Sequence, residues 1–186
     1  MKSTILTAFV LATVAMQAQS DKPQGVTSQP HQTDSSLTAQ TRTAFQSVSE
    51  NILNAAREMP ETSYSFKSAS GVRSFGDLIS HIAEVQATLC AGMNGHQVAS
   101  GPNLKASKDD RIKSLANSVS ECQVSFDELS AQNVNKTVQT PEGELTHMGA
   151  LIFILTHASV EYGQLGVYLR LNHLMPPTSD ETKGIL

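Results

Sequence analysis

The stretch that decides the fold is residues 147–172, HMGALIFILTHASVEYGQLGVYLRLN. Its apolar residues cover nearly the whole circumference of a helix, which is typical of the most buried element of a helical bundle. Asn172 and the Pro176-Pro177 pair that follows are expected to end this helix. The segment therefore predicts a central helix that other amphipathic helices must cover.

Three earlier segments have apolar residues at three- and four-residue steps, the pattern of a helix with one buried face. The predicted helices are residues 37–59, capped by Ser35 or Ser36 and stopped by Pro60, residues 75–93, capped by Ser74, and a helix that opens at Ser107 with an apolar stripe to Leu129. The only extended structure expected is a short excursion on each side of the PEG turn at 141–143. Four helices joined by long connections predict an all-α four-helix bundle with crossover connections.

The first twenty residues, MKSTILTAFVLATVAMQAQS, have the layout of a secretory signal peptide. Lys2 precedes an apolar run from Ile5 to Met16, which is too short to span a bilayer. The alternative is an uncleaved N-terminal anchor. We expect cleavage near residues 18–20 and export to the periplasm or the extracellular space. The predicted organisation of the chain is then a signal peptide at 1–20, a flexible leader at 21–35, the bundle domain at 36–180 and a tail at 181–186.

The charge of the chain argues against two classes of partner. Without Lys2, the chain has 12 basic and 17 acidic residues, a net charge of −5, and no cluster of Lys or Arg. Binding to nucleic acid needs a basic face that replaces counterions on phosphates, so we expect no nucleic-acid partner. An anionic membrane surface is disfavoured for the same reason, and no later stretch is apolar enough for stable membrane insertion.

Two cysteines, Cys90 and Cys122, are expected to form a disulfide in an exported chain. The alternative is two buried free thiols. Cys90 follows His81 by nine residues, which on a helix places the two side chains on opposite sides, about 13.5 Å apart along the axis. Cys90 is therefore a poor ligand for a site at His81, and it is better placed to face Cys122 on the inward stripe of the third helix.

A His–Glu pair, His157 and Glu161, lies one helical turn apart within the central helix. Residues at this spacing project from one face, so both side chains can reach a single metal ion. With His81, the pair would give two imidazoles and one carboxylate, the ligand set of catalytic zinc and non-haem iron sites. The alternative is an internal His–Glu hydrogen bond, or a solvated flank of the helix, with no ion.

The remaining histidines are not expected to join this site. His147 lies about 15 Å from His157 along the helix axis, too far to share an ion, and we expect it at the surface of the first turn. His96 and His173 lie in loop and helix-end positions that predict exposure to solvent. Glu84, one turn from His81, could accept a hydrogen bond from a ligand, although a surface role is the simpler interpretation.

Three motifs in order along the chain resemble the DinB-like family, which includes the YfiT-type metalloenzymes. The motifs are RSFGDLISHIAE around the second-helix histidine, THASVEYGQLGVYLRLN in place of the HxxxHxGQ-type block of the fourth helix, and the MPPTS tail. The resemblance covers residues 40–180. It implies a four-helix bundle with metal ligands at His81, His157 and Glu161.

The third ligand departs from the family pattern, because the family usually has histidine at the position of Glu161. A carboxylate still binds zinc, nickel, manganese or iron, and it shifts the preference towards harder ions. The identity of the divalent metal ion is therefore left open.

The resemblance implies an exported, DinB-like, metal-dependent enzyme that acts as a hydrolase or a small-molecule transferase. Gln164 and Tyr168, one and two turns beyond Glu161, would contact the substrate or a ligand, with ordinary packing as the alternative. Some relatives are thiol transferases, but their low-molecular-weight thiols are chiefly cytoplasmic, so export argues against that donor.

The second hypothesis is a non-catalytic bundle that binds a ligand or a protein partner and has a structural or lost metal site. A homodimer is compatible with either hypothesis.

Overall fold

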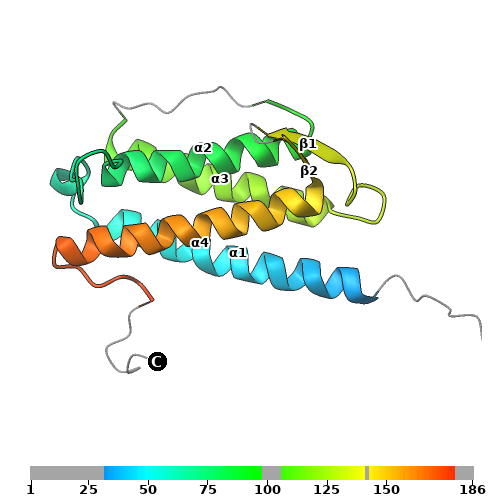
Figure 1. Cartoon of the computed structure of the whole chain (residues 1–186), viewed down its shortest axis with the longest axis horizontal. Helices are drawn as coiled ribbons and strands as arrows, with labels where there is room; N and C mark the ends of the chain where they lie inside the picture. The colour runs from blue at the N-terminus through cyan, green and yellow to red at the C-terminus, as the bar shows by residue number, and fades with distance from the viewer. Residues whose placement is uncertain (1–31, 98–105, 141–142, 179–186) are drawn as a thin grey trace, which may run out of the picture. The chain divides into compact units, whose positions relative to one another are not determined.

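The computed structural model describes residues 32–97, 106–140 and 143–178. In this part of the chain, four long helices form a bundle and a small β-hairpin lies at one end (Figure 1). The elements are α1 (Gln32–Glu58), a 3₁₀ turn (Glu61–Ser63), α2 (Phe75–Met93), α3 (Lys108–Glu128), β1 (Thr137–Thr140), β2 (Gly143–Thr146) and α4 (His147–Leu171). The predicted all-α four-helix bundle is confirmed.

Local side-chain chemistry sets the start of two helices as predicted. The Ser74 hydroxyl accepts a hydrogen bond from the Asp77 amide at the start of α2. Ser107 and Asp110 form a reciprocal capping box at the start of α3. Such caps satisfy amides that have no partner within the helix.

The start of α1 differs from the expectation. The helix begins at Gln32, five residues before Leu37, so Ser35 and Ser36 lie within it and do not cap it. The Ser36 hydroxyl accepts a hydrogen bond from the Gln40 side chain one turn later, at 3.0 Å. These first turns carry polar side chains, so hydrophobic periodicity gave no signal for them. Residues 32–35, expected in the leader, therefore belong to α1.

The helices are arranged so that α2 contacts α3 and α4, and α1 contacts the same two helices. Helices α2 and α3 run parallel, as their successive contacts Gly76–Arg111 and Gln86–Ser118 show. Two parallel neighbours cannot be joined by a tight hairpin turn. The predicted crossover connection is therefore present, and α4 runs antiparallel to α2.

The interior contains two hydrophobic clusters, and the cysteines lie in the second one. Cys90 and Cys122 are fully buried and bonded, with an S–S distance of 2.03 Å. The predicted disulfide is confirmed, and the alternative of two free thiols is wrong. It joins α2 to α3 beside Phe126, Leu151 and Ile154.

The hairpin packs over the C-terminal end of α2. A Cβ atom added at Gly92 would lie 2.9 Å from a methyl group of Val138, so the absence of a side chain allows β1 to approach the helix. The strands pair antiparallel, with Val138 opposite Leu145. This contact holds β1, including Gln139, beside the α2–α4 groove.

No helix in the three described ranges combines the length and the apolar character that crossing a membrane requires. The predicted signal peptide lies outside the described residues, so export remains a prediction.

Candidate metal centre

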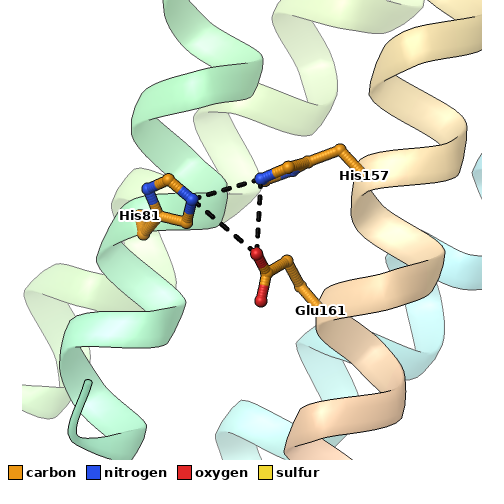
Figure 2. Close-up of side chains that lie close together, drawn as sticks. All are labelled: His81, His157 and Glu161. Carbon is orange, nitrogen blue, oxygen red and sulfur yellow. Dashed lines mark hydrogen bonds and ion pairs between the residues drawn. The ribbon is translucent and has the colours of Figure 1, made fainter. Parts of the chain in front are cut away.

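Two neighbouring antiparallel helices bring three potential ligands together. His81 projects from the middle of α2, and His157 and Glu161 project from α4 one turn apart (Figure 2). Nε2 of His81 lies 3.2 Å from Nε2 of His157 and 3.7 Å from Oε1 of Glu161. Nε2 of His157 lies 3.4 Å from the same oxygen. The three residues that the sequence singled out therefore converge on one point.

These distances suit the donor set of a divalent ion. Ligands at 2.0–2.2 Å in tetrahedral geometry are about 3.3 Å apart, close to the three separations observed. Two imidazole nitrogens and one carboxylate oxygen would form one face of the coordination sphere and leave the opposite side open. Among the described residues, His81, His157 and Glu161 are the metal-ligating side chains whose donor atoms lie close enough together to hold one ion.

Burial keeps both imidazoles in the form that can bind a metal. Burial lowers the pKa of His81, as do the positive charges of Arg73 and His157, while the Glu161 carboxylate acts in the opposite direction. Burial is also the main cause of the lowered pKa of His157. A neutral imidazole presents a free lone pair, so at neutral pH both rings are available as ligands.

Two neighbouring side chains orient the ligands. The Gln164 amide donates a hydrogen bond of 2.7 Å to Oε2 of Glu161, which leaves Oε1 facing the histidines. The Phe153 ring stacks against His157, with a distance of 5.9 Å between centroids. Nδ1 of His157 is buried and has no hydrogen-bond partner among the described residues. The carboxylate is thus held by a polar contact and the imidazole by an apolar one.

A cavity of about 560 Å³ opens beside the three residues. It extends from His81 along α2 in the direction of the hairpin. Its other lining residues are Glu84, Val85, Thr88 and Leu89 of α2, Gln139 of β1, and Phe153 of α4. The cluster therefore has access to a space large enough for a small molecule.

The other predicted site residues have different positions. Gln164 contacts Glu161 as expected, and Glu84 lines the cavity. Tyr168 is buried, and its hydroxyl donates to the carbonyl oxygen of Arg73. The Tyr168 ring packs against Phe66 and Phe75 and does not line the cavity, so its contacts are structural.

One expectation about the remaining histidines is wrong. His147 is buried at 9% exposure and not on the surface, because the chain before α4 folds over it and its amide donates to the Lys136 carbonyl. His96 and His173 are exposed as predicted.

Sequence reasoning missed two residues at the cavity. Phe153 lies one turn before His157, so helical spacing could have placed it on the same face. Gln139 reaches the site through the packing of the hairpin against α2, for which the sequence contains no local signal.

Comparison with known proteins places this architecture in a family. The family model of the DinB superfamily matches residues 44–165. A protein of Enterococcus faecalis, described as a conserved protein, is similar in structure with a TM-score of 0.58 and 13% identity, over 73% of this chain and 96% of that chain. No curated protein sequence matches the chain.

Two further solved structures have the same fold. A DinB-like protein of Bacillus cereus aligns with a TM-score of 0.59 and 15% identity, over 72% of this chain and 91% of that one. A mycothiol-dependent maleylpyruvate isomerase aligns with a TM-score of 0.58 and 15% identity, over 72% of this chain and 66% of that one. At these identities the likeness shows the shared fold.

Proposed function

The chain belongs to the DinB superfamily, and from this membership we propose that it is a metal-dependent enzyme whose ion is held by His81, His157 and Glu161. The observation that carries the proposal is the convergence of three donor atoms within 3.2–3.7 Å at the end of a cavity. The reaction class is hydrolysis or group transfer on a small molecule. The metal is a divalent ion such as zinc, nickel, manganese or iron.

The protein's own residues prepare the site for this chemistry. A bound divalent ion would lower the pKa of a water molecule or polarise a substrate oxygen. The two imidazoles supply Nε2 lone pairs, and Gln164 fixes the carboxylate of Glu161 so that Oε1 faces them. Phe153, Val85 and Leu89 give the cavity an apolar wall, against which the apolar part of a substrate would pack.

Elemental analysis of the purified protein tests the ligand set. We expect one equivalent of divalent metal in the wild type, and loss of that metal in His81→Ala and in Glu161→Gln. His96→Ala and Glu50→Gln are matched controls, because both replace exposed residues outside the cavity, and they should retain the metal. Equal metal in all five proteins, or none in the wild type, would contradict the assignment.

Turnover of small ester and amide substrates tests the catalytic part of the proposal. The metal-loaded protein should hydrolyse at least one of them, and Glu161→Gln should not. Stoichiometric metal without any hydrolysis or group transfer would favour a structural ion.

Two observations support the alternative of a non-catalytic bundle. The two imidazoles and the carboxylate already contact one another. In the part of the chain that the structure describes, Nδ1 of His157 also lacks the hydrogen-bond acceptor that a metal-bound histidine usually has. A metal-free cluster of this kind would be a polar contact between α2 and α4. Metal content separates the metal-free form of this alternative from the proposed enzyme, and turnover separates the form with a structural ion.

We propose further that the protein acts outside the cytoplasm. The Lys2 charge and the apolar run from Ile5 to Met16 support export, and the Cys90–Cys122 disulfide is of a type that persists in oxidising compartments. Fractionation of cells, with N-terminal sequencing of the mature chain, should find cleavage near residues 18–20. A full-length cytoplasmic product would contradict export.

A further inference from the structure

The cavity beside the three proposed ligands contains a second carboxylate, which the metal assignment does not use. Glu84 is half-buried and lies three residues after His81, so the two side chains project from the same side of α2. Glu84 does not belong to the cluster whose donor atoms are mutually close enough to share an ion. A half-buried acid that opens into a cavity is available to a ligand.

None of the described residues that line this cavity is a lysine or an arginine. Besides the proposed ligands and Glu84, its wall consists of neutral residues, namely Val85, Thr88, Leu89, Gln139 and Phe153. Arg73, whose charge lowers the pKa of both histidines, precedes α2 and does not line the cavity. The cavity extends from His81 away from Arg73, towards Thr88 and the hairpin. No described side chain of the cavity wall therefore neutralises the negative charge of Glu84.

The cavity also has an apolar side. Val85 and Leu89 of α2 face it from one helix and Phe153 faces it from the other. From His81 to Thr88 the helix rises about 10.5 Å, which is the length of a small molecule with one ring and a short chain. Aromatic and aliphatic walls of this type bind the apolar part of a ligand, and an aromatic face also attracts a cation.

We propose that the cavity selects a small amine with an apolar body, whose ammonium group pairs with Glu84 while the body packs on Phe153, Val85 and Leu89. The substrate's reacting group would then lie at His81, His157 and Glu161. This inference adds a substrate class to the proposed function. Only the position of the reacting group at the three ligands rests on the proposed function. Recognition of the amine by Glu84 does not require the metal.

Binding of two matched probes to the mature protein tests this inference. The probes are 2-phenylethylammonium and 3-phenylpropanoate, which have similar size and shape but opposite charge, and titration calorimetry at neutral pH measures their affinity. An alkylammonium keeps its proton at this pH, as lysine does. We expect the cation to bind about tenfold more tightly than the anion, the difference typical of one charge-assisted contact. Equal affinities, tighter binding of the anion, or no binding of either probe would overturn the inference.

The variant Glu84→Gln assigns the preference to one side chain. It keeps the size of the side chain and removes its charge, so binding of the cation should weaken about tenfold. Glu50→Gln removes an exposed carboxylate outside the cavity and should bind the cation as the wild type does. Circular dichroism of each variant checks the fold. Unchanged binding in Glu84→Gln would overturn the inference.

The metal content of the same samples separates this inference from the proposed function. Glu84→Gln should retain one equivalent of metal, because Glu84 is not a ligand. A metal-free wild type that still prefers the cation through Glu84 would contradict the proposed function and support the amine site. A metal-loaded wild type that binds both probes equally would support the metal site of the proposed function and overturn the amine site.

Discussion

Nε2 of His81 lies 3.2 Å from Nε2 of His157, although 76 residues separate them in the chain. Two imidazole nitrogens at this distance can share one proton or donate lone pairs to one ion, but they cannot both be protonated without repulsion. The Glu161 carboxylate, at 3.4–3.7 Å from both nitrogens, completes the donor set on which the proposed metal assignment rests. The pairing follows from the antiparallel contact of α2 with α4, which aligns the middles of the two helices.

The Gln164 amide is predicted to tune metal affinity without contacting the ion. Gln164→Leu removes the 2.7 Å hydrogen bond to Glu161 and frees the carboxylate to rotate. Loss of such a contact typically weakens metal binding by about 10- to 100-fold. Competition of zinc with a chelating dye measures the affinity. Gln46→Leu, at an exposed position of α1, is the control and should retain wild-type affinity. An unchanged affinity in Gln164→Leu would show that the carboxylate is held by other contacts.

Removal of the disulfide is expected to lower stability strongly and to spare the site. Cys90 and Cys122 are 32 residues apart, and a cross-link that closes a loop of this length stabilises a protein by about 3–4 kcal/mol in the loop-entropy model. The double variant Cys90→Ala/Cys122→Ala should lose about this free energy of unfolding in urea. Because the bond joins α2 to α3 and the ligands lie on α2 and α4, the folded variant should still bind metal. Loss of metal from a folded variant would link the disulfide to the site.

The sequence predicted those parts of the fold that depend on local chemistry. Ser74 and Ser107 cap their helices through contacts three residues ahead, and the spacing of His157 and Glu161 places both on one face of α4. His81 came from the family resemblance, because no local rule states which helix lies opposite α4.

The residues that sequence reasoning misplaced depend on tertiary packing. Tyr168 lies two turns beyond Glu161 on nearly the same side of α4. At its level the neighbours are Phe66, in the segment before α2, and Phe75, the first residue of α2. The burial of His147 and the approach of Gln139 both require the hairpin to fold against α2 and α4. Helical spacing describes the face of one helix and does not specify what packs against it.

Arg111 is predicted to be an important structural cation. It is 7% exposed, and its guanidinium donates to the carbonyl oxygens of Gly76 and Ala106 and to the Ser80 hydroxyl. Arg111→Met would leave these acceptors without that donor, and we expect it to lower the free energy of unfolding by about 2–4 kcal/mol. Arg57→Met removes an exposed arginine and should change stability by less than about 0.5 kcal/mol. Urea denaturation compares the two, and equal losses would refute the special role of Arg111.

The buried His147 predicts a loss of stability in acid. Burial, helped by the charge of Lys136, lowers the pKa of His147 below its ordinary value of 6.5. As the pH falls through 6.5, the unfolded chain therefore binds a proton at this residue before the folded chain does. The unfolded state is favoured by that proton, so the free energy of unfolding falls with decreasing pH until the lower, folded-state pKa is reached.

The variant His147→Gln isolates this contribution from those of other groups. It cannot take up the proton, so its free energy of unfolding should fall less than that of the wild type between pH 7.5 and a pH well below 6.5. Urea titrations at a series of pH values, with a chelator present to exclude metal binding, measure the difference. His173→Gln replaces an exposed histidine and should retain the pH dependence of the wild type. If His147→Gln has the same pH dependence as the wild type, His147 does not contribute to acid sensitivity, and the loss of stability must originate at other groups.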